Sequence, residues 1–379
     1  MDFMYDDEQE ALRDAVRGLV GKAYNDYEQR RQTVKEDPGF SEKQWARLAE
    51  MGVLGLPFAE EYGGMGAGPI EVGIVAQELG RVVAPEPFLT SVVLAGGLVA
   101  AAGSTEQKRS ILGALASGES VPAFAHAEPG SRWQDAASSV KATSSGDTWT
   151  LTGVKEPVPH GARADVLVVS AVLDSGETGL FVVAPDASGL SRDGYATHDG
   201  GRAARVAFAD TPAEPLGAGG DASVAIERIH TIARIVACNQ ALGAMEVALD
   251  ATTTYLTSRK QFGVTLNTFQ ALTFRASDMY VSLELARSLA TWATMVLADD
   301  PASAGAAASR AALQVSRSGR HIGQEAIQLH GGIGMTAEYS IGSYTSHLTA
   351  LDHLLGDGDF HLSRLSADIG SYDEVDPLP

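Results

Sequence analysis

Ser258-Arg-Lys-Gln-Phe-Gly263, followed by Phe269-Gln-Ala-Leu272, is the most specific stretch of this sequence. It lies between two long runs of apolar residues at helical spacing, 222–258 and 269–298. Gly263 is of the residue type that closes a helix, and Arg259 supplies a planar cation that suits a pyrophosphate. The simpler alternative is a helix end whose basic residues complement the helix dipole. The stretch therefore indicates a junction between two helices that carries a candidate anion-binding arginine.

A second glycine-rich stretch, Gln328-Leu-His-Gly-Gly-Ile-Gly334, follows a third helical run over 302–329. Paired glycines after a helix allow a ligand to approach the backbone closely, although an ordinary glycine cap is the simpler interpretation. No Gly-Lys-Ser/Thr follows, so this stretch is not a Walker loop.

Three zones of different pattern follow one another along the chain. Residues 1–118 have helical periodicity, including a helix over 41–51 for which Ser41 is the N-cap candidate. Residues 119–217 contain short β-branched runs between Gly, Asp and Ser turns, which predicts a small antiparallel sheet domain. Residues 218–379 return to helical periodicity, with an acidic end over 373–379 that we expect to be frayed.

The bulk composition excludes several classes of protein. The 379 residues suit two or three domains, and a formal net charge of -20 disfavours binding to nucleic acid. No apolar stretch reaches the length of a membrane span, and the N-terminus lacks the pattern of a secretory signal. Cys238 is the only cysteine, which rules out an intrachain disulfide and fits a reducing cytoplasm.

Several motifs in the right order resemble the acyl-CoA dehydrogenase family nearly end to end. The closest resemblance is to the small subunits of two-subunit enzymes such as pimeloyl-CoA dehydrogenase. The late Leu355-Gly-Asp357 and His361 also look like bacterial members of the family. The other motifs are Leu54-Gly-Leu-Pro57, Glu61-Tyr-Gly-Gly64, Ala127-Glu-Pro129, Arg259-Lys-Gln-Phe-Gly263 and His330-Gly-Gly-Ile-Gly334.

This resemblance implies a mainly α fold with a β domain: an N-terminal helical domain, a middle β-barrel-like domain and a C-terminal four-helix bundle. It also implies FAD, whose adenine end a neighbouring subunit covers. Arg259 and Gln270 of one subunit would meet the FAD of its neighbour, and Phe262 is a further cofactor-binding residue that the resemblance implies. The adenosine-diphosphate portion would be lined by Gln328, Leu329, Gly331 and Gly332.

The reaction implied is α,β-dehydrogenation of an acyl-CoA thioester, in which a carboxylate removes the α proton and the flavin accepts hydride. Family members place that base at one of two sites, and here those sites hold Ala233 and Leu355. Neither side chain can accept a proton. Glu246 lies 13 positions beyond Ala233, a rotation of roughly 220° at about 100° per residue, so it faces away. His230 lies more nearly on the face of Ala233, as does Gln240, and is the other weak candidate.

The segments expected beside the flavin ring also depart from the family pattern. Ala127-Glu-Pro129 lacks the hydroxyl of the usual Thr-Glu-Pro, and Pro157 and Pro159 replace the usual Trp-x-Thr. Proline offers neither a hydroxyl nor a backbone N–H. The missing features belong to the ring and the chemistry, whereas the retained features belong to the part that covers a neighbour's FAD.

Three hypotheses follow for the function. The first is a subunit that completes the active site of a partner chain, within a homo- or hetero-oligomer that uses acyl-CoA and an electron-transfer flavoprotein. The second is a self-sufficient homo-oligomeric dehydrogenase with His230 or Glu246 as an atypical base. The third is a binding or scaffold protein that kept the fold and lost the cofactor. Whether the chain is itself an enzyme stays open at this point.

Overall fold

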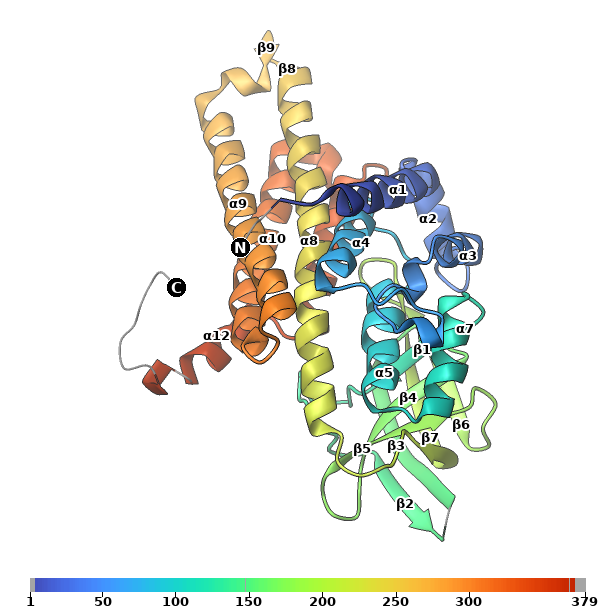
Figure 1. The fold of residues 1–379 in the computed structure, drawn as a ribbon. Helices are drawn as coiled ribbons and strands as arrows, with labels where there is room; N and C mark the ends of the chain where they lie inside the picture. Colours follow the sequence, from blue (N-terminus) through green and yellow to red (C-terminus); the bar gives the residue numbers. More distant parts are fainter. Residues whose placement is uncertain (1–3, 147, 368, 372–379) are drawn as a thin grey trace.

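The protein is described by a computed structural model that covers residues 4–146, 148–367 and 369–371. An N-terminal group of helices and a β domain lie on one side of a long helical bundle (Figure 1). The acidic end over 373–379 lies outside the described residues. This arrangement confirms the predicted fold class of helical domain, β domain and helical bundle.

The N-terminal helices begin where the sequence supplies caps. The side chain of Ser41 accepts a hydrogen bond from the backbone of Gln44 at 3.2 Å, which confirms the predicted cap. Pro69 starts the helix that packs against the bundle, as its fixed φ favours. A π-helical stretch over Phe88–Gly96 was not predicted. The helices are α1 (Asp7–Tyr24), α2 (Tyr27–Lys35), α3 (Glu42–Glu50), α4 (Pro69–Arg81), α5 (Gly97–Ala102), α6 (Thr105–Gln107) and α7 (Gly113–Ala116).

The middle domain is a seven-stranded sheet that closes on itself. The strand order is β1-β4-β2-β3-β7-β5, β4 also pairs with β5, and β6 pairs with β7. The sheet is mixed, because β1 runs parallel to β4. The predicted small antiparallel sheet is therefore corrected at the pairings of β4 with β1 and β2, which are parallel. The strands are β1 (Pro122–Ala125), β2 (Lys141–Ser145), β3 (Thr148–Pro159), β4 (Val166–Val172), β5 (Thr178–Val183), β6 (Leu190–Ala196) and β7 (Arg202–Pro215).

The C-terminal bundle is built around one helix of 36 residues, α8 (Ser223–Ser258). That helix is long and apolar enough to span a membrane, but 78% of its most apolar window is buried inside the protein. It is therefore the core helix of the molecule. Its partners are α9 (Gln270–Asp299), α10 (Ala304–His330), α11 (Ile341–Leu354) and the shorter α12 (Gly358–Ala367).

The junction between α8 and α9 corrects one expectation. Helix α8 ends at Ser258, and Gly263 does not close it. A short hairpin follows, in which β8 (Lys260–Gln261) pairs with β9 (Val264–Thr265). Phe262 and Gly263 form its two-residue turn with φ of 54° and 84°. A hairpin of this kind needs positive φ at both central positions, which is why glycine stands there.

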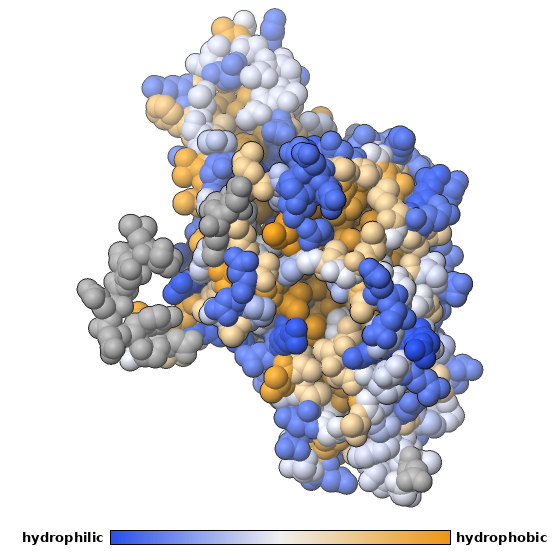
Figure 2. All heavy atoms as spheres, in the orientation of Figure 1, coloured by the Kyte–Doolittle hydropathy of each residue, from blue (hydrophilic) through white to orange (hydrophobic). Residues whose placement is uncertain are grey.

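Helix α4 docks onto α8 at two glycines. A Cβ on Gly80 would lie 1.9 Å from the carbonyl oxygen of Gln240, and one on Gly243 would lie 1.9 Å from that of Gln77. Both positions therefore require glycine for the backbones to meet. Figure 2 shows apolar residues gathered where the N-terminal helices meet the bundle, with hydrophilic residues around them.

A buried carboxyl group connects α1, the start of α3 and the segment after α4. Tyr24 donates a hydrogen bond to Glu86 Oε1, and the backbone N–H of Ser41 donates to the same oxygen at 3.3 Å. The other oxygen, Oε2, has no partner among the described residues. Burial raises the pKa of Glu86 to about 7, although the hydrogen bond from Tyr24 opposes this rise.

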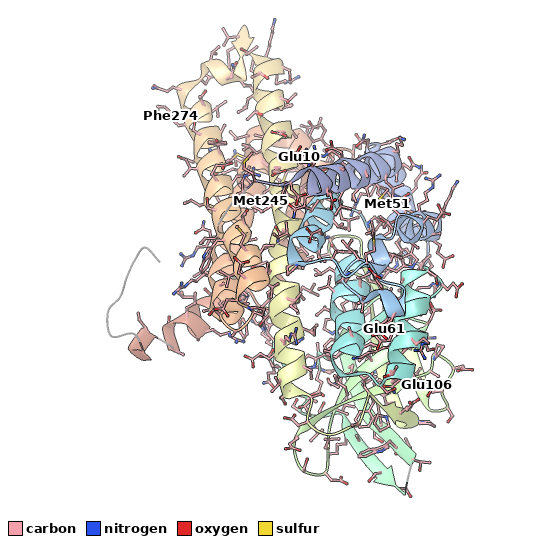
Figure 3. All side chains as sticks on the ribbon, in the orientation of Figure 1. Glu10, Met51, Glu61, Glu106, Met245 and Phe274 are labelled. Atoms are coloured by element: carbon pink, nitrogen blue, oxygen red, sulfur yellow. The ribbon has the colours of Figure 1, made fainter. Side chains whose placement is uncertain are left out.

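We expect Glu86 to make stability depend on pH near neutrality. Because its pKa is higher in the folded chain than in the unfolded one, its contribution is complete below about pH 4.5 and is lost as pH rises through about 7. Relative to Glu86→Gln, the wild type should lose up to about 1.4 kcal/mol per pH unit in that window. Urea unfolding at a series of pH values measures this. The exposed Glu61 (Figure 3) gives the control, since the free energy of unfolding of Glu61→Gln should change with pH in parallel with that of wild type. Parallel curves for Glu86→Gln and wild type would contradict the assignment.

Candidate functional site

A cleft of about 760 Å³, counting its opening to solvent, lies where the middle domain meets the bundle. The middle domain contributes the loop after β1 together with Pro157 and Pro159 of β3. Helix α8 contributes His230 and Arg234, and the end of α11 contributes 353–355. On the sequence alone, the two usual base positions, the weak candidate His230 and both prolines are expected near the flavin. Of these residues, His230, Leu355, Pro157 and Pro159 line the cleft, and Ala233 does not.

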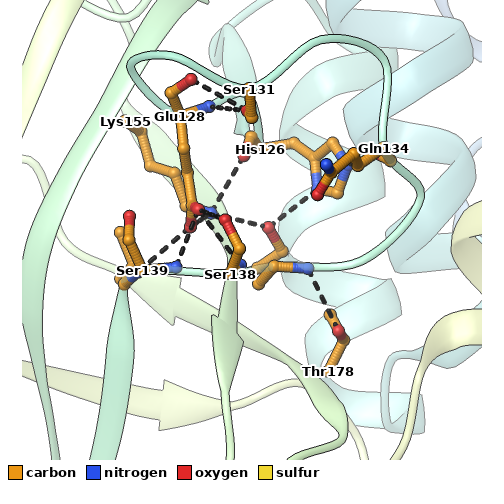
Figure 4. A network of polar contacts seen from close by, with 11 residues as sticks. His126, Glu128, Ser131, Gln134, Ser138, Ser139, Lys155 and Thr178 are labelled. Carbon is orange, nitrogen blue, oxygen red and sulfur yellow. Dashed lines mark hydrogen bonds and ion pairs between the residues drawn. The ribbon is translucent and has the colours of Figure 1, made fainter.

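A buried ion pair holds the cleft loop on the sheet (Figure 4). Glu128 Oε1 lies 2.8 Å from Lys155 Nζ, and the lysine side chain has no exposed surface. Backbone N–H groups of Ser139 and Val140 donate to the carboxylate at 2.8 and 3.0 Å. Burial alone would raise the pKa of Glu128, but the hydrogen bonds from Lys155 and Ser138 hold it at about 2. The pair is therefore charged and serves as a support for the loop.

His126 is locked in the neutral form beside that pair. Its Nε2 lies 2.6 Å from the carbonyl oxygen of Gln134, so Nε2 carries the proton. Its Nδ1 then accepts from the hydroxyl of Ser170 at 2.8 Å, and Ser170 in turn accepts from Lys155 at 3.1 Å. Burial and the nearby His230 lower the pKa of His126 to about 3. Both ring nitrogens are engaged, so His126 shapes the cleft without acting as a base.

Two residues of the same loop reach across the cleft to the bundle. Asp135 Oδ1 lies 2.7 Å from His230 Nδ1 and 3.6 Å from Arg234 Nη2. Trp133 Nε1 donates to the carbonyl oxygen of His353 at 2.9 Å, and its ring lies against Phe360. The sequence reasoning missed both residues. No local pattern marks them, because their partners stand far away in the chain.

The two usual base positions are apolar in space as well. Ala233 is fully buried in the core and does not line the cleft. Leu355 ends α11, lines the cleft, and uses its carbonyl oxygen to accept from Arg234 Nε at 3.0 Å. Neither position brings a proton acceptor into the cleft.

The two weak base candidates lie in different places. His230 lines the cleft, donates Nδ1–H to Asp135 and leaves Nε2 without a partner among the described residues. Gln240, which shares its helix, is buried and lies 3.3 Å from the ring of His347, outside the cleft. His230, like His353, is therefore a side chain of the cleft that could accept a proton from a ligand, and of the two it is His230 whose other ring nitrogen is held by a carboxylate.

Glu246 lies well outside the cleft and joins three helices. It accepts from Gln77 of α4 at 2.9 Å, pairs with Arg287 of α9 at 2.6 Å, and also pairs with Arg81 of α4. Its side chain is 13% exposed. Glu246 therefore lies among the bundle helices, on the side of α8 away from the cleft, as its rotation from Ala233 along the helix predicts.

The two glycine-containing motifs come together at the far end of the bundle. The ring of His330, the last residue of α10, stacks on Tyr255 of α8 at 4.5 Å between centroids. The backbone N–H of Arg259 donates a hydrogen bond to the carbonyl oxygen of Tyr255 at 2.8 Å. Figure 1 shows the β8–β9 hairpin at this tip of α8 and α9. The side chain of Arg259 is exposed and forms no ion pair with any described residue.

Most of the predicted cofactor residues form an open surface at this tip. Phe262 is 91% exposed, and Gln270 begins α9 in an exposed position. Nothing lies within 4 Å of a Cβ built on Gly331 or Gly332. Gln328 is exposed, whereas Leu329 is buried in the bundle core and offers no side chain to a ligand.

The tip and the cleft lie far apart in one chain. Arg259 follows Ala233 by 26 positions, 259 minus 233, along a continuous helix that ends at Ser258. At about 1.5 Å per residue this is roughly 39 Å. The span exceeds the length of one extended dinucleotide, so one bound molecule does not reach both places within a single chain.

Comparison with known proteins gives the family. Residues 6–119 match the acyl-CoA dehydrogenase N-terminal domain, and residues 222–369 match the C-terminal domain. The short-chain-specific acyl-CoA dehydrogenase of Clostridium acetobutylicum is 30% identical, over 90% of this chain and 92% of that one. The chain belongs to the acyl-CoA dehydrogenase family.

Two solved structures whose names give a pair of proteins are also similar to this chain. The Tcur3481-Tcur3483 steroid ACAD matches with a TM-score of 0.87 and 32% identity, covering 96% of this chain and 98% of that one. The ChsE4-ChsE5 complex from Mycobacterium tuberculosis matches with a TM-score of 0.89 and 27% identity, covering 99% and 100%. The expected resemblance to the family is confirmed.

We expect Glu246→Gln to lower stability and leave any cleft chemistry unchanged. Loss of the charge weakens pairs to Arg81 and Arg287, so the free energy of unfolding should fall by roughly 1–2 kcal/mol. Glu284 also pairs with Arg287, but at the surface, and Glu284→Gln should cost less than about 0.5 kcal/mol. Chemical unfolding measures both. Unchanged stability with abolished turnover in Glu246→Gln would instead make it catalytic.

Proposed function

We propose that this chain is a subunit of an FAD-dependent acyl-CoA dehydrogenase and completes the FAD site of a partner subunit. FAD-dependent acyl-CoA dehydrogenation is the activity of the family to which the chain belongs. The observation that carries the proposal is the open, cationic tip about 39 Å from the chain's own cleft. A group that binds there comes from another subunit.

The tip fits the adenosine-diphosphate end of a dinucleotide. Arg259 is exposed with a guanidinium free to form paired hydrogen bonds to a pyrophosphate. Gly331 and Gly332 leave open space beside the backbone, and Phe262 presents an exposed ring. Gln270 and Gln328 add exposed amide groups at the same end.

The chain's own cleft fits a flavin ring poorly. Pro157 and Pro159 line it without an N–H to offer, and Ala127 has no hydroxyl. The carbonyl oxygen of Ala127 already accepts from the backbone of Glu156 at 2.8 Å. Trp133 also lines the cleft and is held there by its hydrogen bond to the carbonyl oxygen of His353 at the end of α11. FAD, when bound to an acyl-CoA dehydrogenase, supplies the redox chemistry, and this cleft provides few groups to hold its ring.

An exposed apolar stripe on α9 supports assembly with another subunit. Phe274, Val281 and Leu285 are 58%, 55% and 53% exposed and stand seven and four positions apart, on one helix face. Phe274 is marked on α9 in Figure 3. We infer a homo- or hetero-oligomer in the cytoplasm that acts on acyl-CoA and passes electrons to an acceptor such as an electron-transfer flavoprotein.

One observation favours a second function, a self-sufficient dehydrogenase. His230 faces the cleft while Asp135 holds its Nδ1–H at 2.7 Å. Burial alone would raise the pKa of Asp135, but the hydrogen bond with His230 and the charge of Arg234 hold it at about 2. A carboxylate that orients a histidine in this way makes Nε2 available as a general base.

We expect Arg259→Ala to weaken FAD binding in the assembled enzyme. The lost charge-assisted contact is worth roughly 1.5–3 kcal/mol, which corresponds to about a tenfold to hundredfold loss of affinity. Flavin absorbance per chain and FAD titration of the apoprotein measure it. The neighbouring exposed Lys260 is the control, because Lys260→Ala removes the same charge from the next position of the chain. FAD affinity that is equal in both variants and wild type removes Arg259 from the site.

We expect the purified chain to oxidise acyl-CoA slowly or not at all with an artificial electron acceptor. No carboxylate stands at either base position, and positioned general-base catalysis is worth about 10²–10⁴-fold. Co-expression with a partner that carries the base should restore turnover. In that complex, His230→Gln in this chain should leave the rate unchanged. An ordinary rate from the lone chain that His230→Gln abolishes would replace this proposal with the self-sufficient enzyme.

A further inference from the structure

A second large cavity lies between the N-terminal helices and the bundle. It measures about 990 Å³ with its opening to solvent. Helices α1 and α2, the end of α4 and the start of α11 form its walls. It shares none of its lining residues with the cleft described above. Its charged and aromatic lining consists of Arg17, Tyr24, Tyr27, Arg30, Glu78, Arg81 and Tyr344.

Arg30 is a buried cation in the wall of this cavity. It is only 6% exposed, and it forms no ion pair with any described residue. Its Nε donates to the carbonyl oxygen of Val83 at 2.6 Å, and its Nη2 donates to that of Asp199 at 3.5 Å. The guanidinium has five N–H groups, so three have no protein acceptor. A buried charge without a counter-charge is costly unless something neutralises it.

The other two arginines of the cavity are already neutralised. Arg17 binds Glu78 through two hydrogen bonds of 2.8 and 2.7 Å. Arg81 pairs with Glu246 and lies 3.8 Å from Glu78. Within the described part of the chain, Arg30 is therefore the one cation of this lining that lacks a carboxylate partner.

Neutral donors surround the same space. The hydroxyls of Tyr27 and Ser340 and the side-chain amide of Asn25 form no hydrogen bond with any described residue, and all three residues line the cavity. The carboxylate of Asp199 is held by His347 and by the backbone of Gly201, so it acts on Arg30 only through space, where its charge partly opposes the lowering of the Arg30 pKa by burial. The cavity thus offers one guanidinium without an ion pair and several free donors.

We propose that this cavity binds a phosphate-bearing anion, with Arg30 as its counter-charge. A guanidinium with one free edge suits two phosphate oxygens, and hydroxyl and amide donors complete such a site. The anion offsets the cost of the buried charge. The site is separate from the tip of the bundle, and it does not rest on the function proposed above.

The test is direct binding of inorganic pyrophosphate to the full chain, measured by calorimetry at constant ionic strength. Wild type should bind, and Arg30→Gln should lower the affinity at least tenfold. Arg13 of α1 pairs with Glu10 and Asp14 outside the cavity, so Arg13→Gln is the matched control and should bind like wild type. No binding by wild type, or equal binding by Arg30→Gln, overturns the proposal. An equal loss in Arg13→Gln also overturns it, because the effect is then one of general charge.

Arg30 also joins α2 to the segment after α4, so Arg30→Gln is first checked for folding by circular dichroism. Tyr27→Phe and Ser340→Ala keep Arg30 in place and should each weaken pyrophosphate binding severalfold. Unchanged affinity in both variants overturns the site even if Arg30→Gln unfolds.

Two further measurements, competition with pyrophosphate and flavin content, identify the source of the phosphate. If the anion is a free metabolite, orthophosphate or ADP should compete with pyrophosphate while flavin content stays the same in Arg30→Gln. If it belongs to a bound FAD, Arg30→Gln should lower flavin content and added FAD should displace pyrophosphate. Because the tip is itself proposed to hold a pyrophosphate group, each titration is repeated in the Arg259→Ala background. Binding that persists in Arg259→Ala and is lost on adding Arg30→Gln belongs to this cavity, so failure at the bundle tip and failure at this cavity are distinguishable.

Discussion

The backbone contact between α4 and α8 is the constraint on which the rest of the structure depends. At Gly80 and Gly243 the two helices approach so closely that any side chain would collide with a carbonyl of the other helix. This contact fixes the N-terminal domain on the bundle at one height along α8. Glu246 lies one turn above it and ties Arg81 and Arg287 across the same joint. The cavity beside Arg30 lies at that joint too, since Arg81 and Val247 are in its wall.

Because α8 is a single uninterrupted helix, its two ends carry separate tasks. The N-terminal part of α8 forms the cleft with the middle domain, and its C-terminal end carries the open surface around Arg259. Contacts within the chain cross the cleft, chiefly Asp135 to His230 and Trp133 to His353. At the tip, the side chains of Arg259 and Gln270 form no hydrogen bond or ion pair with any described residue, and under the proposed function a second subunit covers them. The helix would then separate the groups that the chain satisfies by itself from those that an assembly satisfies.

The sequence predicted those features that depend on local periodicity. The long helices and the Ser41 cap follow from residues close together in the chain, and the phase of Glu246 follows from helix geometry alone. Gly263 was misjudged because glycine closes helices and hairpins equally well, and the strands that decide between them are only two residues long. The parallel pairing of β1 with β4 and the role of Asp135 were not predictable in this way. Both depend on partners tens of residues away, and Asp135 meets His230 across 95 positions.

The two arginines proposed as anion contacts, Arg259 and Arg30, differ in a way that decides how each can be used. Arg259 is exposed, so water solvates it and the chain folds without any penalty from its charge. A ligand there contributes to assembly and little to the stability of the isolated subunit. Arg30 is buried by folding itself, so its charge is desolvated in every folded chain. An anion that binds only the folded state then stabilises it by mass action, as RT ln(1 + [L]/Kd). Occupancy beside Arg30 would thus set how firmly α2 and the bundle are held together, and occupancy at the tip would set whether two subunits share a cofactor.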